Sequence, residues 1–140
     1  MVNHMLINML RNLDILNIDV DAFGLNLSGN MGYPLNVDGS DPERQQWVRN
    51  TASHNTVVVD GHGQTELTWG GEPRHFADSG RVKVMDADAT NAYPETDIYR
   101  RTLVTVDIDD RDSYMVDFFR AGDPAHQRAD GLVADSLDTR

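Results

Sequence analysis

The feature that most constrains the fold of this chain is a period-two alternation of apolar and polar residues in short runs. In ILNIDVDA (residues 15–22), one face of an extended chain carries Leu16, Ile18, Val20 and Ala22, and the other carries Asn17, Asp19 and Asp21. The runs LVTVDIDD (103–110) and YMVDFFR (114–120) repeat this pattern on either side of the turn DRDS. We therefore predict half-buried strands, the last two of which form a long hairpin.

Further strands are predicted where β-branched residues precede turn signals. TVVVD (56–60) is typical of a buried strand closed by an Asp-Gly turn, and RVKVM (81–85) is typical of another short strand. The expected strands begin at Leu16, Thr56, Arg81, Tyr99 and Tyr114. The residues expected in the core include Val58, Val104, Val106, Val116 and Phe118.

Helical periodicity occurs only near the start of the chain, in NHMLINMLRNL (residues 3–13), which predicts one short N-terminal helix. Strands punctuated by Gly, Pro and Asp, in a chain of 140 residues, predict a single all-β domain built as an antiparallel β-sandwich. We expect a divergent segment at 1–13 and the sandwich region at 14–121. The remainder, 122–140, is expected to be an irregular tail or the start of a continuation.

The composition limits which classes of partner the chain can bind and which kinds of catalytic or metal site it can form. The net charge of −11 disfavours nucleic acid and anionic membranes, although arginines in WVRN and YRRT could still meet a carboxylate or sulfate. The absence of cysteine excludes disulfides, a thiolate nucleophile and any Cys-ligated metal. The first residues lack the basic region and cleavage site of a signal peptide, so the sequence leaves the localisation open.

Four stretches carry a family resemblance: DILNIDVDAFGLNLSGNMGYP (14–34), WVRNTASHNTVVVDGHGQ (47–64), YRRTLVTVD (99–107) and YMVDFFRAGDPAH (114–126). In their order and spacing they resemble the heparinase II/III-like polysaccharide lyases, whose relatives include oligoalginate lyases. SHNTVVVDGHGQ is the specific element. The resemblance implies β-elimination on uronate-containing acidic polysaccharides by enzymes, often periplasmic or secreted, that join an α/α toroid to β-sandwich sheets. This chain would then be part of the sandwich without its toroid.

The resemblance also implies a use for His54. In this family a histidine of the HNT type, one from an upstream H-x-H-x-D motif and an aspartate before a G-Y pair hold a divalent metal, usually zinc. If Asp14 belongs to that upstream motif, the histidine positions fall on Leu10 and Asn12, and the G-Y aspartate falls on Asn30. Leucine cannot ligate a metal, and two amides are poor substitutes for an imidazole and a carboxylate. We therefore expect His54 to be a hydrogen-bonded residue at a strand end, close to Asn30, and zinc not to be bound.

Other candidates have a structural interpretation beside the functional one. Tyr33, in MGYP, is the one candidate for a cleft tyrosine, and packing or capping the turn is the more common role. Asp19 and Asp21 could form an acid/base pair, but alternate residues on a strand more often make a solvated face. Trp47 and Trp69 could stack on sugars, with packing favoured. Solvent-exposed polar side chains are expected at His62, His75 and His126.

Two functions from different classes remain open. The chain is either the sandwich portion of a polysaccharide lyase, inactive in isolation, or a non-catalytic β-domain for glycan contact or oligomerisation. The missing histidines favour the second for the isolated chain, whereas the resemblance favours the first for its ancestry. In either case Asn55 and Thr56 are expected to satisfy loop backbone. Because the resemblance begins abruptly at Asp14, we also hypothesise a truncated gene product with a substituted start, which an in-frame upstream toroid would refute.

Overall fold

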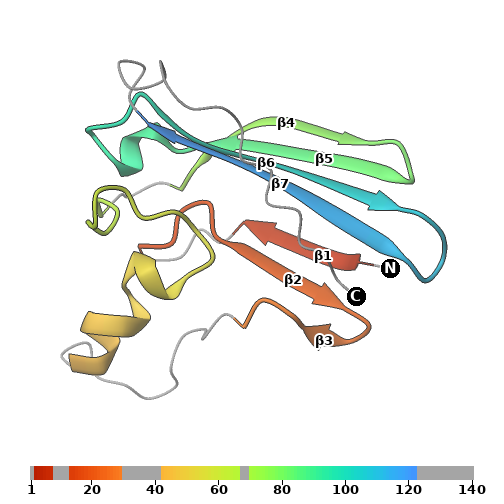
Figure 1. Ribbon diagram of the computed structural model, residues 1–140, viewed down its shortest axis with the longest axis horizontal. Helices are drawn as coiled ribbons and strands as arrows, with labels where there is room; N and C mark the ends of the chain where they lie inside the picture. The colour runs from red at the N-terminus through yellow and green to blue at the C-terminus, as the bar shows by residue number, and fades with distance from the viewer. Residues whose placement is uncertain (1, 8–12, 30–41, 67–69, 123–140) are drawn as a thin grey trace.

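The computed structural model describes residues 2–7, 13–29, 42–66 and 70–122, which form two antiparallel sheets in layers (Figure 1). The first sheet has the order β1-β2-β3 and the second the order β4-β5-β6-β7. The strands of the first are β1 (Val2–Ile7), β2 (Ile18–Ala22) and β3 (Leu25–Asn26). Those of the second are β4 (Glu72–Asp78), β5 (Val82–Asp88), β6 (Ile98–Asp107) and β7 (Ser113–Gly122). The helical turns are η1 (Arg44–Val48), η2 (Thr51–Ser53) and η3 (Thr90–Ala92).

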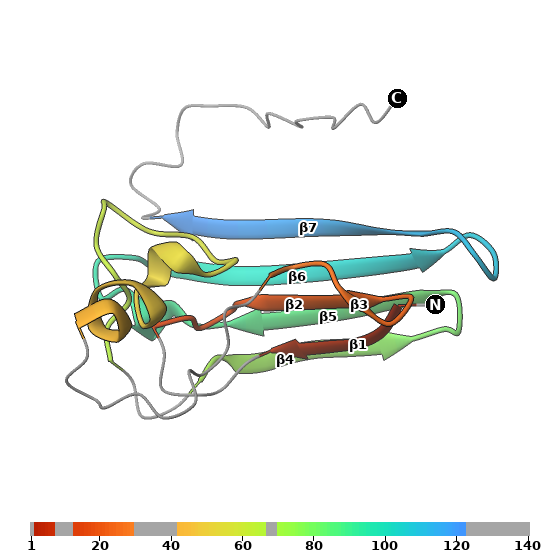
Figure 2. The ribbon, with the colours of Figure 1, turned by 90° about the horizontal axis from the view of Figure 1, so that it is seen from below.

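This arrangement confirms the all-β prediction and most of the expected strands. The strands predicted from Leu16, Arg81, Tyr99 and Tyr114 all occur, each beginning within two residues of the expected position. The long hairpin is β6 and β7, which pair in register over their whole lengths. Figure 2 shows β7 at one edge of the four-stranded sheet, with β1 and β2 layered over β4 and β5.

The prediction of an N-terminal helix was wrong. Residues 2–7 form β1, which pairs antiparallel with β2 and places Met5 opposite Val20 and Ile7 opposite Ile18. A short helix is marginal on its own, whereas a strand beside β2 has its backbone groups satisfied by the ladder. Tertiary pairing therefore overrides the local helical period, and part of the segment predicted to be divergent belongs to the sheet.

The prediction of a strand at Thr56 was also wrong. Residues 56–58 lie outside the strands, and the nearby pairing is an isolated bridge between Val59 and His62 that closes the Asp60-Gly61 turn. The backbone of this segment is satisfied by side chains instead, because the hydroxyl of Tyr99 donates to the carbonyl of Val57 at 2.6 Å. A β-branched run is therefore held without joining a ladder.

The residues predicted to form the core of the second sheet lie on its outer face. Leu103 and Tyr99 are buried on the face toward the first sheet, whereas Val116 and Phe118 are 36% and 52% exposed on the opposite face. The other three expected core residues, Val58, Val104 and Val106, are only partly buried. Apolar residues occupy both faces of this hairpin, so a period of two predicts strands without deciding which face is inside.

The core itself lies toward the end of the sandwich where the helical turns gather. It consists of Ile15, Leu16, Ala87, Ala89, Ala92, Tyr93 and Tyr99. The ring of Tyr99 lies 4.9 Å from that of Tyr93 and 5.0 Å from that of Phe119, centroid to centroid. Edge-to-face contacts of this kind orient aromatic rings as well as bury them, so Tyr99 is fixed at the centre of the core.

Candidate functional site

His54 is a buried loop residue and does not begin a strand. It follows η2, whose N-cap residue Asn50 accepts a hydrogen bond from the backbone of Ala52 at 3.0 Å. The imidazole Nε2 lies 2.9 Å from the carbonyl oxygen of Val48. A carbonyl can only accept, so Nε2 carries a proton and donates it. In neutral His54, Nδ1 is then the nitrogen with the lone pair.

That second nitrogen faces Asp14. His54 Nδ1 lies 4.0 Å from the carboxylate of Asp14, and both side chains are 1% exposed. Nδ1 has no hydrogen-bond partner among the described residues. An imidazole and a carboxylate from distant parts of the chain are therefore packed together out of water.

The described residues do not fit a zinc site. Zinc sites in proteins take three or four ligands, and His54 with Asp14 offers two groups. Within residues 2–7, 13–29, 42–66 and 70–122, no group of three or more His, Cys, Asp or Glu could hold a metal ion. The remaining positions of the expected site lie outside the described residues: Leu10, Asn12, Asn30 and Tyr33.

The two residues after His54 connect the layers through hydrogen bonds. The backbone N–H of Asn55 donates to Asn17 Oδ1 at 2.8 Å, and its side-chain amide donates to the carbonyl of Ser28 at 3.0 Å. The hydroxyl of Thr56 donates to the carbonyl of Ile15 at 3.0 Å. Both residues thus satisfy loop backbone, as expected from the sequence.

Gln64 and Tyr99 extend this connection into the core. The amide of Gln64 donates to the Tyr99 hydroxyl at 2.8 Å and to the carbonyl of Ile15 at 2.9 Å, while its oxygen accepts from the N–H of Ile15 at 2.7 Å. The Tyr99 hydroxyl also lies 2.9 Å from that of Thr56. Burial is the main cause that raises the pKa of Tyr99, so this phenol stays protonated at neutral pH.

Arg101 is the fifth member of the connection. Its Nη1 donates to the carbonyls of Leu16 at 2.6 Å and Asn55 at 2.5 Å. Its Nε and Nη2 donate to the two carboxylate oxygens of Asp117 at 3.0 and 2.5 Å. The guanidinium therefore ties the turn at residues 14–17 and the loop at Asn55 to the β6–β7 hairpin. We call Asn55, Thr56, Gln64, Tyr99 and Arg101 the polar clamp.

The arginines that could have met an anionic ligand are occupied. Arg100 binds Asp86 through two nitrogens, and Arg49 pairs with Glu66. The guanidinium beside it is the main cause that holds the pKa of Asp86 below its ordinary value of 3.8. WVRN and YRRT thus present their arginines to carboxylates of this chain.

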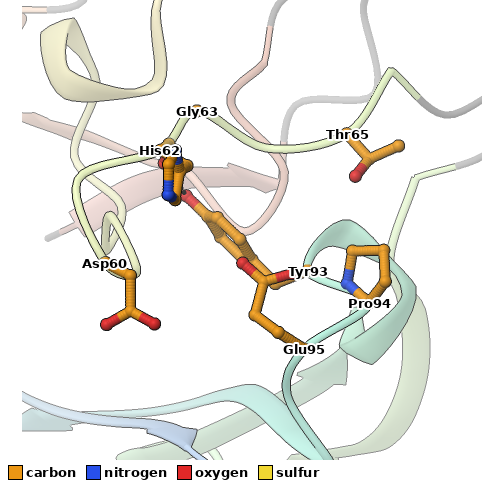
Figure 3. A pocket seen from close by; sticks show the side chains of 7 residues that line it. All are labelled: Asp60, His62, Gly63, Thr65, Tyr93, Pro94 and Glu95. Carbon is orange, nitrogen blue, oxygen red and sulfur yellow. Dashed lines mark hydrogen bonds between the residues drawn. The ribbon is translucent and has the colours of Figure 1, made fainter.

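A separate pocket of about 520 Å³ opens beside the Asp60-Gly61 turn (Figure 3). It is lined by Asp60, His62, Gly63, Thr65, Tyr93, Pro94 and Glu95. Asp60 and Glu95 are exposed, and His62 is exposed as predicted. The hydroxyl of Tyr93 donates to the carbonyl of His62 at 3.0 Å, which anchors the turn. With two carboxylates on its rim, the pocket favours hydrogen-bond donors and cations over anions.

The remaining candidates have plain surroundings. Asp19 accepts hydrogen bonds from the side chains of Asn26 and Ser28, so it supports the β2–β3 turn. Trp47 is 52% exposed, so it does not pack in the core, which was one of the two kinds of packing expected, and His75 is exposed as predicted. Trp69 and His126 lie outside the described residues. Among the residues that the structure covers, no helix has the length and apolar character needed to cross a membrane.

The sequence profile of one family, described as heparinase II/III-like, C-terminal, matches residues 17–134. The chain belongs to this family. No curated protein and no solved structure matches it. The family assignment confirms the resemblance drawn from the four stretches, and the β-sheet structure agrees with it.

Within this heparinase II/III-like domain, sequence reasoning missed Gln64 and Arg101, which connect the loops to the core and to the second sheet. Gln64 closes the specific element SHNTVVVDGHGQ, and Arg101 occupies a core-facing position of β6 between Tyr99 and Leu103. A polar residue at an inward position of a strand needs buried partners. That signal was available in YRRTLVTVD once its inward face was known.

Proposed function

We propose that this heparinase II/III-like domain is the sandwich portion of a polysaccharide lyase, which would cleave uronate-containing acidic glycans only when joined to an α/α toroid. The observation that carries the proposal is the family match over residues 17–134. In β-elimination a base removes the proton α to the carboxylate, positive or neutral groups hold the developing charge, and an acid protonates the leaving oxygen. We infer that the isolated chain lacks this set.

The described residues support the inactivity of the isolated chain. Tyr93 and Tyr99 are buried, and burial is the main cause that raises the pKa of each phenol, which disfavours a role as base. Arg49, Arg100 and Arg101 each bind a carboxylate of the chain, so a uronate would have to displace an ion pair. Losing one catalytic group commonly costs on the order of a thousandfold in rate.

The experiment follows the ultraviolet absorbance of unsaturated uronate with alginate, heparin or heparan sulfate as substrate. We expect no protein-dependent rise with the unmodified chain. The lyase ancestry is tested by joining the chain to the toroid of an active lyase of the family. The chimera should cleave, and a chimera that also carries Leu10→His, Asn12→His and Asn30→Asp should cleave faster. A folded chimera that stays inactive in both forms contradicts the ancestry, and activity of the unmodified chain contradicts the inactivity.

We further propose that the unmodified chain binds no zinc, because His54 and Asp14 supply too few ligands. Titration calorimetry should detect no zinc binding to the unmodified chain and about one equivalent to the variant with Leu10→His, Asn12→His and Asn30→Asp. Adding His54→Ala to that variant is the control and should remove the binding. Stoichiometric binding by the unmodified chain that is lost with His54→Ala would overturn the proposal.

The pocket at the Asp60-Gly61 turn favours a second candidate function, glycan contact without catalysis. Its exposed carboxylates, Asp60 and Glu95, can accept hydrogen bonds from sugar hydroxyls but repel uronates. A neutral oligosaccharide should therefore shift the amide NMR signals around His62, and a polyuronate should not. The variant Asp60→Asn, Glu95→Gln should lose this preference against the polyuronate. Equal shifts with both glycans, or none with either, would refute glycan contact here.

A further inference from the structure

Among the described residues, no strand pairs with the outer edge of β7, which is long. Strand β7 runs from Ser113 to Gly122 without proline, pairs with β6 along one side, and is the last strand of the described sheet (Figure 2). The outward face of its end near the turn carries exposed apolar side chains at Tyr114, Val116 and Phe118. An edge of this kind is a template for another strand, and this one carries apolar side chains that such a strand would cover.

The register of β6 and β7 determines which backbone groups face outward. Asp107 N–H donates to Arg81 at 2.8 Å, toward β5, and Ile108 N–H donates to Asp112 at 2.9 Å, toward the β7 side. Antiparallel pairs alternate between hydrogen-bonded and non-hydrogen-bonded positions. The even-numbered residues of β7 therefore bond to β6. The odd-numbered ones, from Ser113 to Ala121, turn their N–H and C=O groups to the open edge.

We propose that this edge pairs antiparallel with β7 of a second copy of the chain, about a two-fold axis at Val116. In that register Val116 lies opposite its own copy, Tyr114 opposite Phe118 and Asp112 opposite Arg120. These are non-hydrogen-bonded positions, where facing side chains come closest. The pairing joins the two four-stranded sheets into one and continues their exposed apolar face across the axis.

Charge selects this register. Arg120 lies opposite Arg100, whose guanidinium is bound to Asp86, and neither Arg120 nor Asp112 forms an ion pair with a described residue. The proposed axis gives each Arg120 an aspartate from the second copy. Moving the axis one residue to Asp117 would place two carboxylates opposite each other, and moving it to Met115 would place Asp112 opposite Phe118.

The proposal is independent of any lyase or glycan role, and its test needs no substrate. Sedimentation velocity of the full chain over a range of concentrations should show a monomer in equilibrium with a dimer. Either Asp112→Arg or Arg120→Asp alone places like charges together twice in the dimer and should raise the dissociation constant roughly tenfold. The double variant restores both pairs with opposite sign and should return the constant to near that of the unmodified chain.

Matched controls come from the other edge of the same sheet. Glu72→Arg and Arg74→Asp make the same charge changes on β4, where both side chains are exposed, and should leave the dimer unchanged. Amide exchange at Met115 and Asp117 should slow as the dimer forms. A chain that stays monomeric, a dimer indifferent to the single variants, a double variant that fails to recover, or an open-ended assembly would each overturn the proposal.

Discussion

Removing the hydroxyl of Tyr99 tests whether the polar clamp holds the domain together. The variant Tyr99→Phe keeps the buried ring and its contacts with Tyr93 and Phe119, and loses only the oxygen. That oxygen donates to the carbonyl of Val57 and accepts from Gln64 Nε2, with the Thr56 hydroxyl also in reach. The perturbation is therefore confined to the hydrogen bonds of one buried atom.

The expected cost follows from what each partner retains. The hydroxyl protons of Tyr99 and Thr56 are used for the carbonyls of Val57 and Ile15, so two hydrogen bonds are lost, at a net ~1 kcal/mol each. The amide of Gln64 and the hydroxyl of Thr56 keep their bonds to the carbonyl of Ile15, at 2.9 and 3.0 Å. The carbonyl of Val57 keeps only a long contact of 3.4 Å with the hydroxyl of Tyr93. We therefore expect the free energy of unfolding to fall by about 2 kcal/mol.

Urea denaturation followed by circular dichroism measures this change. With a slope of about 2 kcal/mol/M, the midpoint should fall by roughly 1 M. Tyr114→Phe is the matched control, because that side chain is 51% exposed on the outer face, and its midpoint should hardly move at a protein concentration that keeps the chain monomeric. If both variants shift the midpoint equally, or if Tyr99→Phe changes the unfolding free energy by less than about 0.5 kcal/mol, the clamp does not stabilise the fold.

Further predictions concern the two bidentate arginine pairs. Arg101→Met should lower the free energy of unfolding by about 3 kcal/mol, because it strands two loop carbonyls and the carboxylate of Asp117. Adding Asp117→Leu should recover part of that loss in the same urea assay. Arg100 depresses the pKa of Asp86, so this pair adds stability above pH about 4 that is lost as the pH falls through the lowered pKa. Asp86→Asn should therefore flatten the acid limb of stability measured from pH 6 to pH 2, and an unchanged limb would exclude this pair as its cause.

The sequence predicted the sandwich well because alternation and turn residues act locally. β2, β5, β6 and β7 all carry a period of two that no helix could use, so their existence followed from the residues alone. β1 could not be predicted in this way, because its strand state comes from pairing with β2. The inward face of β6 was equally hidden, since Arg101 and Thr105 are polar and yet buried there.

The register set from Asp14 placed Leu10, Asn12 and Asn30 at the site of His54, and these three positions lie outside the described residues. The contact between His54 and Asp14 itself was not predicted from the sequence. The sequence alone does not show which partner each polar side chain binds. Gln64 and Arg101 find their partners at Ile15, Leu16 and Asp117, far away in sequence, and only the fold brings those groups within hydrogen-bonding distance.

These contacts also explain how a chain of this family would keep its recognisable sequence if its catalytic groups were replaced. In SHNTVVVDGHGQ, Asn55, Thr56 and Gln64 hold the loops to the core, and in YRRTLVTVD the same is true of Tyr99 and Arg101. Replacing any of these residues should lower the free energy of unfolding. Replacing a proton-transferring imidazole by leucine would instead lower the rate of catalysis. A family match that rests on the polar clamp is therefore evidence for the sandwich, and activity has to be tested separately.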